Sequence, residues 1–283
     1  MLAALVPLSA AFCLSCSAGA PSDIARVELV EAWRLDGFSS PESVLLDPAT
    51  GLLFVSNVNG EGGFRDGNGF ISRITLDGEI ETLEWATGLD APKGMALVGD
   101  RLYVTDIAQI VCIDRTTGEI TDRWPAPGAG FLNDAVAGPD GRVYVSDSRT
   151  ARIYVLEDGM VHVWAEHDTL SAINGLWIEE DRMLTVTMEG VFASLSLSDQ
   201  SLTPLGTGLG SADALVSDGQ GAYLASEWPG QIYHLRGDGS FDVLADTRDQ
   251  DIYMNDFIRV DDMLIVPHWS PGAVSAWQIR YHH

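Results

Sequence analysis

Six short segments of the 283-residue chain repeat one pattern, a polar residue close to the start of an apolar run. The six polar residues are separated by intervals of 39 to 51 residues, and they are Glu42, Lys93, Asn133, Asn174, Asp213 and Asn255. Carboxylate and amide oxygens are the ligands that Ca²⁺ prefers in proteins. The set contains no histidine or cysteine, which disfavours zinc. If the six side chains converge, they predict a site for one divalent metal, most simply Ca²⁺.

These residues also have a structural interpretation, because polar side chains at the start of a strand often bond only to the backbone of a turn. Six such residues in register are more than that role requires, since Ala, Ser or Val would serve equally well at an unused position. Glu42, Asn174 and Asp213 would supply three ligands and leave positions open for water or substrate, as a catalytic metal needs. We expect a functional site here.

The elements that position these residues are short strands. The first three polar residues are each followed by a turn and a β-rich run, namely 52–56, 101–105 and 142–146. Third and fourth strands follow in most copies, as in residues 151–156 and 160–164. Four short strands in a unit of about 40 residues are typical of a β-propeller blade. Six copies predict an all-β, six-bladed β-propeller. A solenoid fits less well, because no capping repeat is visible.

The sixth copy supplies only three strands, over residues 254–280. A ring with an incomplete last sheet would expose a strand edge. Residues 26–35 precede the first copy and read as an unassigned strand. We therefore expect this N-terminal strand to pair with residues 272–280 and complete the last blade.

Propeller topology assigns the polar residues to one end of the central channel. Each lies at the start of the innermost strand, and the loops that leave the second strands overhang the same end. The loop of the first blade, residues 57–69, contains five glycines and predicts a mobile lid. Glu227 and His268 begin two other overhanging loops, next to Trp228 and Trp269, and we interpret both as candidate substrate contacts.

Lys93 is the only lysine of the chain, beside 15 arginines. Three roles fit an ammonium group in the ring: an ion pair with Glu42, a donor to a developing oxyanion, or a contact to a substrate carboxylate. The ion pair is favoured, because an unpaired buried ammonium is costly.

Composition limits the partners and indicates a compartment. Acidic residues outnumber basic ones by 41 to 16, a net charge of −25, which excludes nucleic acid as a partner. Residues 1–20 carry no charge and end in small residues, so we expect a signal peptide or lipoprotein signal, with a propeller domain over 21–283. The apolar run is too short to span a bilayer. Export to the periplasm or the medium follows, with Cys16 as a possible lipid anchor.

The chain resembles the senescence-marker-protein/gluconolactonase (regucalcin-like) family of six-bladed propellers over residues 24–280. The best-matching stretches are residues 131–136, 139–147 and 173–176. The resemblance implies one divalent metal, commonly Ca²⁺, held by Glu42, Asn174 and Asp213. It implies contact of Asn133 with substrate or metal, and hydrolysis of lactones. Sugar lactonases of the family carry Arg where this chain has Phe131, which argues against a polar sugar lactone.

The expected function is therefore an exported, metal-dependent hydrolase of a lactone or related ester, with Asp213 as general base. Beside the metal ligands, we expect the small-molecule substrate to contact Asn133, Lys93, Asn255, His268 and Glu227. Two alternatives stay open. One is a non-catalytic propeller that binds a ligand or a protein, and the other is a calcium-binding protein without turnover.

Overall fold

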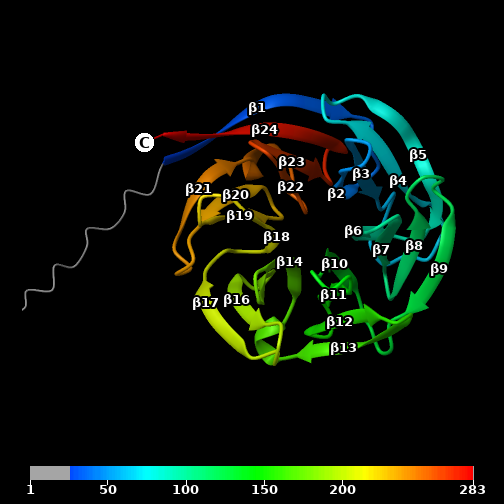
Figure 1. Cartoon of the computed structure of the whole chain (residues 1–283). Coiled ribbons are helices and arrows are strands. Elements are labelled where there is room, and N and C mark those ends of the chain that lie inside the picture. Colours follow the sequence, from blue (N-terminus) through cyan, green and yellow to red (C-terminus); the bar gives the residue numbers. More distant parts are fainter. Residues whose placement is uncertain (1–25, 283) are drawn as a thin grey trace, which may run out of the picture.

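The computed structural model describes residues 26–282, which form six four-stranded antiparallel sheets around a central channel (Figure 1). The predicted all-β, six-bladed propeller is confirmed. The segment 1–20, with its expected signal sequence and Cys16, lies outside the described residues. Within residues 26–282, no helix is both long and apolar enough to cross a bilayer.

The blades follow one another along the chain, and in the first five the strand order runs from the channel outward. Blade 1 contains β2 (Pro41–Asp47), β3 (Leu52–Asn57), β4 (Gly69–Thr75) and β5 (Ile80–Leu89), and blade 2 contains β6 (Pro92–Val98), β7 (Arg101–Asp106), β8 (Gln109–Asp114) and β9 (Ile120–Pro125). Blade 3 contains β10 (Leu132–Ala137), β11 (Val143–Asp147), β12 (Arg152–Glu157) and β13 (Met160–Glu166). Blade 4 contains β14 (Ile173–Glu179), β15 (Arg182–Thr187), β16 (Val191–Ser196) and β17 (Leu202–Thr207), and blade 5 contains β18 (Ala212–Ser217), β19 (Tyr223–Glu227), β20 (Gln231–Leu235) and β21 (Phe241–Asp246). Two 3₁₀ turns, η1 (Asp168–Leu170) and η2 (Arg248–Gln250), follow blades 3 and 5.

The sixth blade closes the ring with both ends of the described chain. It contains β22 (Ile258–Val260), β23 (Met263–His268) and β24 (Ala273–His282), and β1 (Arg26–Asp36) is its outermost strand. β1 pairs antiparallel with β24, from Arg26 opposite His282 to Asp36 opposite Ala273. In Figure 1 these strands, blue and red, lie side by side at the rim. The predicted closure is confirmed. β1 covers the edge of β24 that would otherwise be exposed.

Burial follows from the stacking of blades on one another. The strands in the middle of a blade are covered on both faces by neighbouring blades, so all five residues of β11 are buried. Outer strands such as β9 alternate between half-buried and exposed residues, because only one face meets a neighbour. The hydrophobic clusters accordingly lie between blades, and Leu184, Phe192 and Tyr223 join blades 4 and 5 in one of them. Stacked blades hold the inner strands rigidly around the channel.

Candidate functional site

A cavity of about 400 Å³ lies at the end of the channel where the inner strands begin. We call it the mouth cavity. Five of the six predicted ring residues line it: Glu42, Lys93, Asn133, Asp213 and Asn255. Loops that leave the second strands of blades 1, 4, 5 and 6 supply the other side, through Gly62, Met188, Trp228 and Trp269. The topology predicted from the repeat therefore brings these distant segments together at one place.

A recurring bulge aims the ring residues toward the mouth. In each of the first five blades, the pairing of the inner strand with its neighbour shifts register close to the ring residue, as between Pro41 and Val44 or between Ala212 and Leu215. A bulge places an extra residue in one strand and redirects its side chain. Glu42 and Asp213 lie within these irregular stretches. The direction of their side chains therefore does not follow from the alternation of faces along a regular strand.

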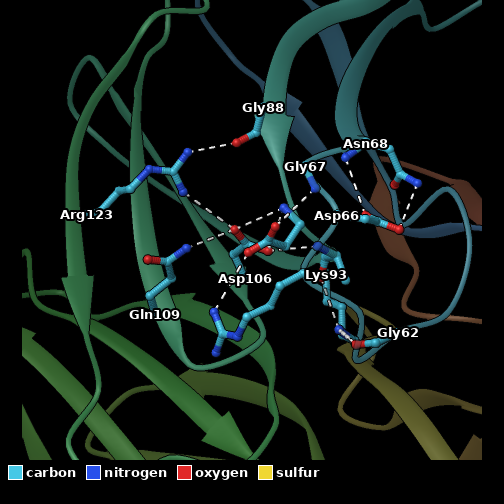
Figure 2. Close-up of polar contacts among 12 residues, drawn as sticks. Gly62, Asp66, Gly67, Asn68, Gly88, Lys93, Asp106, Gln109 and Arg123 are labelled. Carbon is cyan, nitrogen blue, oxygen red and sulfur yellow. Dashed lines mark hydrogen bonds and ion pairs between the residues drawn. The ribbon is translucent and has the colours of Figure 1, made fainter.

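Polar residues at the ends of the second strands fix the approach to the ring. Asp106 accepts hydrogen bonds from the backbone N–H of Asp90 and Ala91, at 2.8 to 3.2 Å. In blade 3, Asp147 accepts from the N–H of Gly130 and Phe131. Arg123 and Gln109 in turn contact Asp106, as Figure 2 shows. These carboxylates hold the backbone just before a ring residue and are structural.

Two glycines allow the inner strands to approach closely. A Cβ atom on Gly94 would lie 2.5 Å from the Cα of Asp134, and one on Gly175 would lie 2.4 Å from the backbone oxygen of Asp213. Real Cβ atoms do not tolerate such contacts, so only glycine fits directly after Lys93 and Asn174. Close approach of the strands gathers the ring residues around a narrow axis.

The three predicted metal ligands are buried and partly unsatisfied. Asn174 donates through Nδ2 to Oδ1 of Asp213, and it reaches the site through this bond without lining the cavity itself. Oε2 of Glu42 and Oδ1 of Asn174 are buried and lack any hydrogen-bond partner. Leaving a buried polar atom unpaired costs about 1–3 kcal/mol, more for a charged group. Two such oxygens beside the carboxylate of Asp213 fit the donor set of a hard cation.

The electrostatics of the channel agree with this fit. Burial, followed by the charges of Asp213 and Asp256, raises the pKa of Glu42 well above its usual range, against a smaller opposing effect of Lys93. Burial and then the charge of Asp256 raise the pKa of Asp213 in the same way. A divalent cation would offset this repulsion. Among residues 26–282 no cluster of three His, Cys, Asp or Glu side chains is arranged for a metal, so a set built on Glu42 and Asp213 would include the amide oxygen of Asn174.

Lys93 does not form the predicted ion pair with Glu42. Its Nζ donates to the backbone oxygen of Gly62 at 3.0 Å (Figure 2). It also donates to the backbone oxygen of Ala91 at 3.0 Å and lies 4.3 Å from the centre of the Phe131 ring. Within the described part of the chain no carboxylate lies within 4.0 Å of it. One of these carbonyl oxygens comes from the first-blade loop, which reaches Lys93 through Gly62, and the other from the turn just before β6. Burial lowers the pKa of Lys93, opposed by the charges of Glu42 and Asp106.

The first-blade loop overhangs the mouth cavity as predicted. Gly60, Glu61 and Gly62 line it. Besides Lys93, the loop is tied by Gly67 N–H, which donates to Asp90 at 3.1 Å, and by Asn59, which donates to the backbone oxygen of Asn68. That this loop moves as a lid remains a prediction.

His268 and Glu227 do not line the mouth cavity, contrary to the sequence-based expectation. His268 is fully buried, and its ring nitrogens lie 2.7 Å from the oxygens of Tyr253 and Ser275. Burial lowers its pKa to about 4. Glu227 extends toward Gly210 and lies 3.6 Å from Arg248. Both end a second strand, where side chains brace the blade.

The residues that the sequence left unassigned are the apolar ones. Trp228 and Trp269 follow Glu227 and His268 directly, and they, not their neighbours, face the cavity. Phe131 lines it where the family resemblance suggested a lost arginine, and Met188 comes from the fourth blade. Met188, Trp228 and Trp269 come directly after a second strand, and Phe131 comes just before an inner one. This position in the repeat is the sequence signal that could have identified them as lining residues.

A second cavity, of about 320 Å³, lies further along the inner strands. We call it the lower cavity. Its walls are mainly aliphatic, and Asp134 and Asp256 are its only charged lining residues among residues 26–282. Both oxygens of Asp134 accept backbone N–H groups, of Ala135 and Leu176, at 2.6 Å, and Oδ2 of Asp256 accepts the hydroxyl of Ser43 at 2.6 Å. The bonds to Leu176 and Ser43 join successive blades, whereas the bond to Ala135 lies within one strand.

Comparison with known proteins places the fold among solved propellers. A gluconolactonase from Xanthomonas campestris superposes with a TM-score of 0.69 at 16% identity, with 90% of each chain covered. A catalytically inactive virginiamycin B lyase from Staphylococcus aureus, with quinupristin, superposes with a TM-score of 0.62 at 13% identity, over 89% of this chain and 99% of that one. No protein-family model matches the chain, and no curated protein matches it. Identities this low establish a shared fold.

Proposed function

We propose that the protein is a metal-dependent hydrolase of a lactone or related ester, and that the mouth cavity is its active site. The observation that carries the proposal is the pair of partnerless buried oxygens, on Glu42 and Asn174, next to Asp213. The gluconolactonase fold of two solved neighbours supports it. Export to the periplasm or the medium remains part of the proposal and rests on residues 1–20 alone.

Glu42, Asn174 and Asp213 would hold the cation, with Ca²⁺ as the first candidate. A bound divalent cation would polarise the carbonyl of the substrate and stabilise negative charge on its oxygen. Asn255 accepts the N–H of Trp269 through Oδ1 at 3.0 Å, which leaves its amide nitrogen as a donor toward the substrate. Asn133 and Asn255 both line the cavity and would orient the ester group.

Asp213 is the general base of the proposed reaction. Its Oδ1 accepts the amide of Asn174, and Oδ2 remains to take a proton from water. The water oxygen forms a bond to the carbonyl carbon, and the ring C–O bond of the lactone breaks. The proton taken by Asp213 returns to the departing alkoxide oxygen, so that lactone and water give one hydroxy acid.

The test is metal analysis of the purified protein combined with a lactone panel, assayed with and without chelator. We expect about one Ca²⁺ per chain, and turnover that chelation removes and added Ca²⁺ restores. Metal without turnover on any lactone or ester would favour a calcium-binding protein. Turnover that survives complete removal of metal would overturn the proposed role of the three ligands.

A further inference from the structure

The two sides of the mouth cavity differ in chemistry. The ring side presents carboxylates and amides, whereas the loop side presents the side chains of Phe131, Met188, Trp228 and Trp269. Three aromatic rings and a thioether thus surround the place where the part of a substrate remote from its ester group would lie. Cavities of this size, about 400 Å³, hold small organic ligands, and apolar walls favour apolar groups.

This apolar wall is held in place before any ligand binds. Phe131 contacts two cations, with Nζ of Lys93 at 4.3 Å and the guanidinium carbon of Arg149 at 5.7 Å from its ring centre. Trp228 packs on Tyr253, with ring centres 4.6 Å apart. Trp269 packs against a small cluster that includes Val58. A surface fixed in this way binds an apolar group without the cost of ordering its own side chains.

The charges of the cavity act against an anionic substrate. Glu42, Glu61 and Asp213 line it, and within the described part of the chain the ammonium of Lys93 is its only cationic lining group. That ammonium already donates to two backbone oxygens and lies over Phe131, so it is not free to bind a substrate carboxylate. The net charge of −25 adds a long-range repulsion of anions.

We propose that the mouth cavity selects uncharged lactones or esters with an apolar substituent over polyhydroxylated or anionic ones, and that Phe131 and Trp269 are specificity-determining residues. This inference rests on the proposed function, because it names the substrate class of the same site. The ester group meets the polar ring, and the apolar substituent lies against the aromatic side chains.

The test compares δ-lactones that share one six-membered ring and differ only in substituents. δ-Decalactone carries a pentyl chain, δ-valerolactone carries no substituent, and glucono-δ-lactone carries hydroxyl groups. We expect kcat/KM for δ-decalactone to exceed that for glucono-δ-lactone by about 10²-fold, from burial of the chain. Equal or better turnover of glucono-δ-lactone would overturn the inference and leave the proposed function intact.

Variants of Phe131 and Trp269 test whether the apolar side chains of the mouth cavity cause the preference for δ-decalactone. Phe131→Ala and Trp269→Ala should each lower kcat/KM for δ-decalactone about tenfold, mainly through KM, and leave δ-valerolactone within about twofold. Phe64→Ala is the matched control, because Phe64 is an aromatic residue of the first-blade loop that is 62% exposed and does not line the cavity. If the alanine variants fail to fold, Phe131→Leu and Trp269→Phe serve with the same substrates. Unchanged selectivity in folded variants would contradict the assignment.

If no lactone is hydrolysed, the proposed function fails, and binding still tests the selectivity of the cavity. Calorimetry with the lactams that correspond to δ-decalactone and glucono-δ-lactone measures it without turnover. We expect at least tenfold tighter binding of the pentyl lactam. Equal affinity, or tighter binding of the hydroxylated lactam, would overturn the inference independently of catalysis.

Discussion

The mouth cavity and the lower cavity lie at two levels of the inner strands of the ring, and buried carboxylates line both. In the lower cavity, Asp134 accepts backbone N–H groups of Ala135 in its own strand and of Leu176 in the next blade, and Asp256 accepts the hydroxyl of Ser43 in blade 1. At the mouth cavity, an oxygen of Glu42 and the amide oxygen of Asn174, which is bonded to Asp213, are buried without a partner. Polar side chains at the lower cavity thus form hydrogen bonds within the protein, whereas two polar oxygens at the mouth cavity have no hydrogen-bond partner.

The difference teaches that burial and charge alone do not identify a ligand site. The pKa of Asp134 is raised well above its usual range by burial and by the charge of Asp256, much as that of Asp213 is. Hydrogen-bond satisfaction separates the two, because a satisfied carboxylate has no remaining demand for a cation. Four variants test this separation.

The largest effect is expected for Asp213→Asn. The substitution keeps the shape of the side chain but removes the charge and the base, so turnover should fall by roughly 10²–10⁴-fold and calcium binding should be lost. Stopped assays and calcium calorimetry measure both, and circular dichroism checks the fold. Asp199→Asn, on an exposed turn, is the control and should behave as the wild type. Stoichiometric calcium in the Asp213 variant would show that the ligand set is misassigned.

Asp134→Ala should damage the fold more than the site. It leaves two buried N–H groups without acceptors, which lowers the free energy of unfolding by roughly 2–6 kcal/mol, less any relief of its repulsion with Asp256. Urea denaturation measures the loss. Calcium affinity should change far less than in Asp213→Asn. A complete loss of calcium from the folded variant would place the metal deeper in the channel and break the distinction between the cavities.

His268 borders the mouth but should act as a structural residue. Its pKa in the folded protein is about 4, below the ordinary 6.5, so the unfolded chain takes up a proton first as the pH falls. Its share of the stability is therefore full above pH 6.5 and decreases toward pH 4, by at most about 1.4 kcal/mol per pH unit. His268→Gln should remove this share of the slope and leave kcat/KM unchanged. The exposed His162→Gln should keep the slope. A selective loss of turnover would restore His268 to the site.

The smallest effect is expected for Lys93→Met. Loss of the bond to Gly62 should open the first-blade loop and speed trypsin cleavage after the exposed Arg65 by about tenfold, the equivalent of one hydrogen bond. Removal of a positive charge near Glu42 should also tighten calcium binding a few-fold. Gln109→Met removes a bond to Asp106 instead and should leave the cleavage rate unchanged. Unchanged cleavage in Lys93→Met would show that its carbonyl contacts do not restrain the loop.

The sequence was sufficient to predict the number of blades, the closing strand and five residues that line the mouth cavity. A repeat of about 40 residues determines the topology and the end of the channel at which each inner strand begins. It failed where a side chain's direction depends on local backbone. The register shifts beside Glu42 and Asp213 have no sequence signature, and neither does the descent of Gly62 onto Lys93. At the ends of two second strands, we predicted that Glu227 and His268 contact the substrate. The next residues, Trp228 and Trp269, line the cavity instead.

The pairing of β1 with β24 has a mechanical consequence. The antiparallel register sets Arg26 opposite His282, so both ends of the described chain leave the ring at the same point. A force that pulls these ends apart loads the hydrogen bonds between the two strands one after another, not all together in shear. The ring should thus unzip from its seam at low force, and the five remaining blades would then be peeled away from a newly exposed edge.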